Sequence, residues 1–126
     1  MGNAAVKAAP LPNTDWNLFS RALTEAVQSP IAGVQHGALQ QIARYGDKLT
    51  LDDQALFEMI RIYRSDEDDN VRILALSALS KTDNGWVMDF FRRSARFETS
   101  RRVLERTLAV VQEYDQKLLF ANWPSE

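Results

Sequence analysis

The chain has 126 residues, of which 45% are hydrophobic and 25% are charged, and its formal net charge is −2. This length holds one domain with a single core, and the composition is that of a globular protein. The absence of cysteine excludes disulfides, thiolate nucleophiles and cysteine-ligated metals, and the small net charge gives no overall attraction to nucleic acid or anionic membranes.

Residues 1–12 precede the first helical pattern and are rich in alanine. We interpret them as a disordered leader, or as a junction ahead of a domain cut from a longer protein, and residues 13–126 as a single helical domain. The start resembles an N-myristoylation signal, but Val6 stands where that signal requires Ser or Thr. No apolar run approaches the roughly 18 residues of a membrane-spanning helix, so we expect no membrane span.

Two helices are predicted in the first third of the chain. The first is expected to be capped by Asn13 or Thr14. Its apolar residues recur every three or four positions, as on one face of a helix: Trp16, Phe19, Leu23 and Val27. The second is expected to open with Ser29 as cap and Pro30 in the first turn, and to end at Gly46 in a left-handed conformation. Its stripe is Ile31, Val34, Ala38, Ile42 and Tyr45.

The next two helices follow a capping pattern and an acidic run. The third helix is expected to open in a capping box at Thr50, with the stripe Ala55, Leu56, Met59, Ile60 and Tyr63. The fourth is expected to run from Asn70 to about Lys81, after acidic residues 66–69 that cap its positive end. It is apolar around most of its circumference, so several neighbours must cover it. We therefore place this helix in the middle of the structure.

The last two helices are predicted from about Trp86 to Arg96 and from a cap at Thr99 or Ser100. Their stripes are Val87, Phe90, Phe91 and Ala95, and then Val103, Thr107, Leu108, Val111 and Tyr114. The sixth helix can continue into the apolar tail, residues 118–123. We interpret this tail first as a lid folded over the last helix pair, and alternatively as a docking or dimerisation segment.

The second helices of the three pairs align on Val34, Val71 and Val103, at offsets of 37 and 32 residues. These offsets lie within the spacing of helix-pair repeats. Six helices with no strand signal, repeated in this way, predict an all-α fold, an α-solenoid of three antiparallel helix pairs.

Residues 68–81 resemble the second helix of a HEAT repeat. The resemblance consists of an acidic residue, Val-Arg, two spaced alanines and a leucine: Asp69, Val71, Arg72, Ala75, Ala78 and Leu79. The outer repeats match only in their period, because Gln35 and Leu104 replace Arg72. In the family the second helices line a concave side on which peptides or partner proteins lie. The resemblance also implies a structural role for Asp69 and Arg72 in joining repeats.

Arg72 falls inside the apolar arc of its helix, between Leu76 and Leu79 on a helical wheel. A charge at that place is expected to be a structural partner of Asp68 or Asp69 rather than a ligand-binding group.

Two surfaces are candidates for binding a partner. The first is obtained by applying the helical wheel of the second predicted helix to the fourth and the sixth, which gives columns of outward-facing residues. Ile73 is the exposed aliphatic residue among them. The columns consist of His36, Gln40, Arg44, Ile73, Ser77, Lys81, Glu105, Ala109 and Glu113. The other surface is a basic patch that could meet phosphates or an acidic protein: Arg92, Arg93, Arg96, Arg101, Arg102 and Arg106. The alternative for the patch is a solvated face with pairing through Glu98 and Glu105.

The sequence offers few ingredients for catalysis. His36 is the single histidine and lies on a polar helix side. The acidic run 66–69 fails as a calcium loop, because Val71 and Ser77 stand where glycine and a bidentate glutamate are required. We predict no enzyme activity, no metal site and no cofactor. Some proteins similar to HEAT repeats are enzymes, including bilin lyases and certain DNA glycosylases, but neither catalytic set maps onto this chain.

We therefore expect a non-enzymatic protein–protein interaction or scaffold module that uses the concave face, either alone or as part of a larger regulatory protein. The alternatives are anion or nucleic-acid binding through residues 92–106, and a small HEAT-like lyase. We expect a protein or peptide partner rather than nucleic acid, and a soluble monomer or weak homodimer. The compartment stays open, with the cytoplasm slightly favoured over export.

Overall fold

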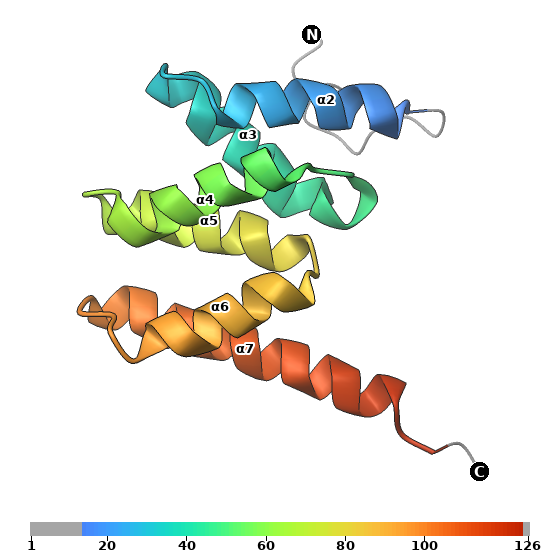
Figure 1. Cartoon of the computed structure of the whole chain (residues 1–126), viewed down its shortest axis with the longest axis vertical. Coiled ribbons are helices and arrows are strands. Elements are labelled where there is room, and N and C mark those ends of the chain that lie inside the picture. Colours follow the sequence, from blue (N-terminus) through green and yellow to red (C-terminus); the bar gives the residue numbers. More distant parts are fainter. Residues whose placement is uncertain (1–13, 125–126) are drawn as a thin grey trace, which may run out of the picture.

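The computed structural model describes residues 14–124, and the leader and the cap predicted at Asn13 lie outside these residues. Every regular element in the described range is a helix, as the all-α prediction requires (Figure 1). The six α-helices are α2 (Trp16–Val27), α3 (Ala32–Tyr45), α4 (Asp53–Ser65), α5 (Asp69–Lys81), α6 (Gly85–Ala95) and α7 (Arg101–Ala121). A single 3₁₀ turn, η1 (Gly46–Lys48), follows α3.

The helices follow one another along the long axis of the molecule, with α2 and α3 at one end and α6 and α7 at the other (Figure 1). Each helix packs against its partner in the sequence, α2 on α3, α4 on α5 and α6 on α7. Helix α5 also contacts α3, α6 and α7, and α2 contacts α4. The central position predicted for residues 70–81 is confirmed.

The core is one cluster that runs through all six helices, and α5 supplies much of it. Ala75, Ala78 and Leu79 are fully buried, and Leu76 is 1% exposed. These residues take up most of the circumference of α5, which is why the helix needs neighbours on several sides.

The outer helices bury narrower stripes than predicted. Ile31, Val34 and Leu108 belong to the predicted inward stripes, but they are 64%, 44% and 50% exposed. Ile31 precedes the first turn of α3, and Leu108 lies on the last helix, where only one side of the row has a neighbour. On α3 the fully buried Leu39 extends the inward face instead.

Side-chain caps open most helices, though not always at the predicted residue. Asp15 rather than Thr14 caps α2, by accepting a hydrogen bond from the Leu18 amide. Asp52 rather than Thr50 caps α4. In both places a carboxylate, which accepts more strongly than a hydroxyl, lies closer to the first turn.

At the other helix starts, the observed cap is also the predicted residue in some cases and a different one in others. Ser29 does not cap α3: its hydroxyl accepts from the Ile31 amide, and the helix begins at Ala32, two residues later than predicted. Asp68 caps α5, as predicted for the acidic run, and Ser100 caps α7. Asn84 caps α6, which begins at Gly85.

Gly46 is not the left-handed cap that the sequence predicts. Its φ of −55° and ψ of −30° are right-handed, and the chain continues into η1. Glycine is needed here for space: an added Cβ would lie 3.0 Å from Cβ of Lys81 and 3.2 Å from its backbone carbonyl carbon. The end of α3 therefore approaches the end of α5 more closely than a side chain allows.

Aromatic contacts join neighbouring helices. Trp16 and Phe19 of α2 meet Tyr45 of α3, with ring centroids 5.9 Å and 6.2 Å apart. Phe57 of α4 meets Trp86 of α6 at 5.6 Å. Contacts of this kind add to the burial of apolar area between helices.

The apolar tail does not fold back as a lid. Helix α7 continues through it to Ala121, as predicted for the sixth helix, and extends past the other helices (Figure 1). The large apolar residues of this part are exposed by 45% to 74%: Leu118, Leu119, Phe120 and Trp123. Within the described range no helix is both long enough and apolar enough to cross a membrane.

Gly46→Ala is expected to lower the free energy of unfolding by about 1–3 kcal/mol, because the added methyl group meets the backbone of Lys81. Gly37→Ala is the matched control, since Gly37 lies inside α3 with nothing within 4 Å of an added Cβ. That change is expected to stabilise by about 0.5–1 kcal/mol through helix propensity. Urea denaturation followed by circular dichroism measures both. Equal shifts in the two variants would contradict the close approach of α3 and α5.

Candidate functional site

The most distinctive polar group in the structure is the buried side chain of Arg72, which is 9% exposed. Its Nε donates to the backbone carbonyl of Tyr63 at 2.6 Å. Its two terminal nitrogens donate to the two carboxylate oxygens of Glu98, at 3.1 Å and 2.5 Å. Asp69 lies farther away, at 3.7 Å. The main partner of Arg72 is therefore Glu98, from the turn between α6 and α7, and Asp69, one of the two predicted partners, forms a longer ion pair with it.

The ionisation of this pair follows from its surroundings. Burial alone would raise the pKa of Glu98, but the hydrogen bonds from Arg72 and the Ser100 amide, together with the charge of Arg72, outweigh burial and lower it. The hydrogen bond with Glu98 is the main cause that raises the pKa of Arg72. Both groups therefore stay charged at neutral pH as a two-pronged ion pair.

Further contacts hold this pair in the core. The guanidinium lies 5.8 Å from the ring centre of Tyr63, in a cation–π arrangement. The Tyr63 hydroxyl bonds to that of Thr107 at 2.6 Å, and burial is the main cause that raises the Tyr63 pKa. Asp69 accepts from the Ser100 hydroxyl at 2.7 Å. The donors of Arg72 are thus used within the protein, which supports a structural role.

Ile73 is not the exposed recognition residue that the helical wheel predicts, because it is 9% exposed. The wheel of α3 does not transfer to α5, since α5 has neighbours on several sides and α3 has fewer. His36 and Ser77 are half-buried, while Gln40, Arg44 and Lys81 are exposed. The predicted columns therefore keep their polar members and Ala109, and lose Ile73, their large apolar residue.

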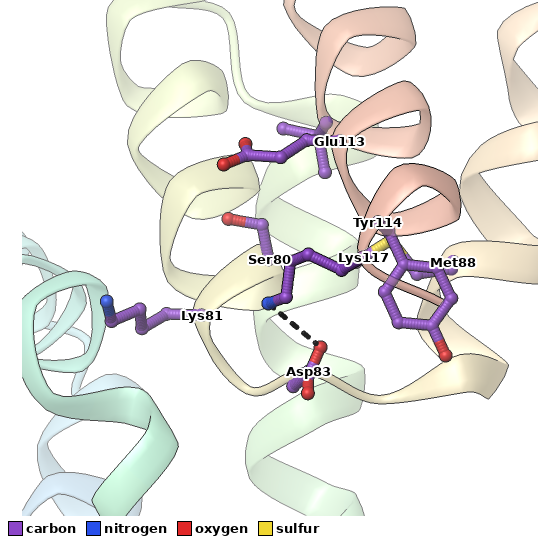
Figure 2. A pocket seen from close by; sticks show the side chains of 8 residues that line it. Ser80, Lys81, Asp83, Met88, Glu113, Tyr114 and Lys117 are labelled. Atoms are coloured by element: carbon purple, nitrogen blue, oxygen red, sulfur yellow. Dashed lines mark ion pairs between the residues drawn. The ribbon is translucent and has the colours of Figure 1, made fainter. Parts of the chain in front are cut away.

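A pocket between the end of α5 and the middle of α7 contains two predicted column residues, Lys81 and Glu113 (Figure 2). Its volume is about 230 Å³. Lys117 points toward Asp83 in Figure 2, and Nζ lies 3.6 Å from the carboxylate. The lining is Ser80, Lys81, Asp83, Met88, Val110, Glu113, Tyr114 and Lys117.

Several residues of this pocket were missed by sequence reasoning. Val110, Tyr114 and Lys117 follow one face of α7 at three- and four-residue steps around Glu113, a spacing that could have indicated them. Asp83 could not have been found in this way, because it lies in the α5–α6 turn with a φ of 55°.

Half of the basic patch is paired: three of its six arginines have polar partners, and Arg93, Arg96 and Arg106 form no ion pair within residues 14–124. Arg92 forms ion pairs with Asp89, at 2.7 Å, and with Asp115 of α7. Arg101 pairs with Glu105, and Arg102 donates to the side chain of Asn70. Arg93 and Arg96 are exposed. The arginines of the patch therefore do not form one continuous cationic surface.

Within residues 14–124, no three His, Asp or Glu side chains gather closely enough to hold a metal ion. Comparison of the chain with protein-family models, with curated proteins and with solved structures gives no significant match.

Arg72→Ala is expected to lower the free energy of unfolding by about 3–5 kcal/mol, because it leaves the buried carboxylate of Glu98 without its partner. Arg64→Ala, at an exposed arginine of α4, is the matched control and is expected to change it by less than about 0.5 kcal/mol. Urea denaturation measures both variants. An unchanged free energy of unfolding for Arg72→Ala would show that the pair contributes nothing to stability.

The lowered pKa of Glu98 predicts a loss of stability in acid. A carboxylate whose folded pKa lies below its unfolded value, here 4.5, stabilises the fold above that value. The contribution disappears as the pH falls through the folded pKa. Thermal unfolding from about pH 6 to about pH 3 is expected to show a steeper decrease for the wild type than for Glu98→Gln. Parallel curves would mean that Glu98 is not the titrating group.

Proposed function

We propose that the chain is a HEAT-like α-solenoid of three antiparallel helix pairs that acts as a non-enzymatic protein-interaction or scaffold module. The resemblance of residues 68–81 to the second HEAT helix supports this proposal. So does the order of contacts, because α3, α5 and α7 are successive neighbours, as the second helices of stacked repeats would be.

The observation that carries the proposal is the charged pocket on the second helices α5 and α7 (Figure 2). Lys81 and Glu113 lie exposed at this pocket, and neither forms an ion pair within the part of the chain that the structure describes. A partner with charges of both signs could pair with them.

The character of the pocket favours a protein surface over a small molecule. Small-molecule sites are mostly apolar concavities with few polar groups. Here Met88 and Val110 are the only apolar aliphatic residues among the eight that line the pocket, and four of the others carry charge. Charged rims of this kind set the specificity and the rate of protein association.

Affinity capture tests the proposal with three forms of the purified chain: the wild type, the double variant Lys81→Glu/Lys117→Glu, and Arg21→Glu. Arg21 is exposed on α2, so its reversal is a control for a change of charge far along the row from α7. We expect a protein from the source organism to be captured by the wild type and by Arg21→Glu, and to be depleted about tenfold by the double variant.

Thermal unfolding must first show that the three forms are equally folded. If every protein captured by the wild type is captured equally by the double variant, this pocket is not the interaction surface.

A further inference from the structure

A second groove, lined by none of the residues of the α5–α7 pocket, has the features of a peptide site. It lies between the end of α4 and α6, has a volume of about 440 Å³, and includes the ion pair of Arg72 and Glu98. The other lining residues are Arg64, Phe90, Arg93, Ser94 and Phe97. We name it the Arg64–Arg93 groove.

The groove is positively charged. The charges of Arg72 and Glu98 cancel within their ion pair, and no other carboxylate lines the groove. In the range 14–124 neither Arg64 nor Arg93 has a carboxylate within ion-pair distance. Two exposed guanidinium groups therefore remain for a ligand, and each can bind a carboxylate through two hydrogen bonds.

Aromatic surface accompanies these charges. Phe97 is 78% exposed, although it lies next to the buried pair. Phe90 is half-buried, and its ring centre lies 6.2 Å from that of Tyr63. When a partner covers an aromatic side chain that is exposed beside a groove, the buried apolar surface stabilises the complex.

We propose that the Arg64–Arg93 groove binds a short acidic peptide segment that places two carboxylates on the arginines and an apolar side chain against Phe97. The two arginines require a negatively charged partner. The exposed phenylalanine indicates that an apolar group accompanies the carboxylates. This surface is separate from the α5–α7 pocket and does not depend on its function.

A peptide fits the surroundings better than a nucleic acid does. The acidic run 66–69 begins two residues after Arg64 in the chain, so a long polyanion that extends past the groove meets repulsion. The nearby Arg61 is paired with Glu58, and the net charge of the chain is −2. Nucleic-acid sites instead combine many cations along a phosphate backbone.

The test uses a display library of random peptides of about 12 residues, selected on the whole purified chain. Enriched peptides are synthesised with a fluorescent label, and their affinity is measured by fluorescence polarisation. We expect enrichment of peptides with at least two acidic residues and one aromatic or aliphatic residue. We expect Arg64→Glu/Arg93→Glu to weaken their binding about 100-fold, or about tenfold for each lost ion pair.

Matched variants separate binding in this groove from binding elsewhere on the chain. Phe97→Ala removes only exposed surface and is expected to weaken binding about threefold to tenfold. Arg21→Glu and Lys81→Glu are expected to leave binding unchanged, so the result is independent of the α5–α7 pocket. Thermal unfolding confirms that each variant is folded before its affinity is measured.

Each of the following outcomes would overturn the proposal. The first is enrichment without acidic residues, and the second is equal binding by Arg64→Glu/Arg93→Glu. The third is preference for another ligand: tighter binding of a labelled single-stranded RNA of about 12 nucleotides would assign the groove to nucleic acid. Likewise, self-association of the wild type that the double reversal abolishes would assign it to a second copy of the chain.

Discussion

A guanidinium group that leaves water must find its hydrogen-bond partners inside the protein, and Arg72 places this demand on several segments at once. It takes the carbonyl of Tyr63 from α4 and the carboxylate of Glu98 from the turn before α7. The Tyr63 hydroxyl in turn bonds to Thr107 of α7. Because these bonds are directional, the second and third helix pairs are fixed relative to each other more narrowly than apolar packing alone would fix them.

The first and second pairs are joined by different means. Between α3 and α5 the contact rests on buried aliphatic residues and on the absence of a side chain at Gly46, which lets η1 lie against the backbone of Lys81. The α3–α5 contact is therefore made by close packing, whereas the junction of the second and third pairs includes a buried polar network, and α5 takes part in both. Junctions as unlike as these respond differently to pH and to salt.

Sequence reasoning found the number of helices, the central position of α5 and the burial of Arg72, because these follow from local period and from charge inside an apolar arc. It missed Glu98 as the partner of Arg72, because the position of a residue 26 places farther along the chain depends on how the chain turns back after α6 and not on local spacing. It also placed Ile73 outside, because burial around a helix depends on its neighbours and not on its own pattern. The position of Gly46 after a helical stripe indicates a left-handed cap, whereas glycine is required there by the approach of another helix. Of the α5–α7 pocket, only Lys81 and Glu113 were predicted.

The tryptophans are unevenly distributed over the helices, so their fluorescence reports on the unfolding of only part of the chain. Trp16 lies in the first pair against Tyr45, Trp86 lies in α6 against Phe57, and Trp123 follows the last helix. No tryptophan belongs to α4 or α5. Emission excited above the tyrosine band therefore reports on the first pair, on the contact of α6 with α4 and on the end of α7, while the ellipticity of the backbone reports on all helices. Terminal fraying would separate the two signals, and their coincidence would indicate a single cooperative transition.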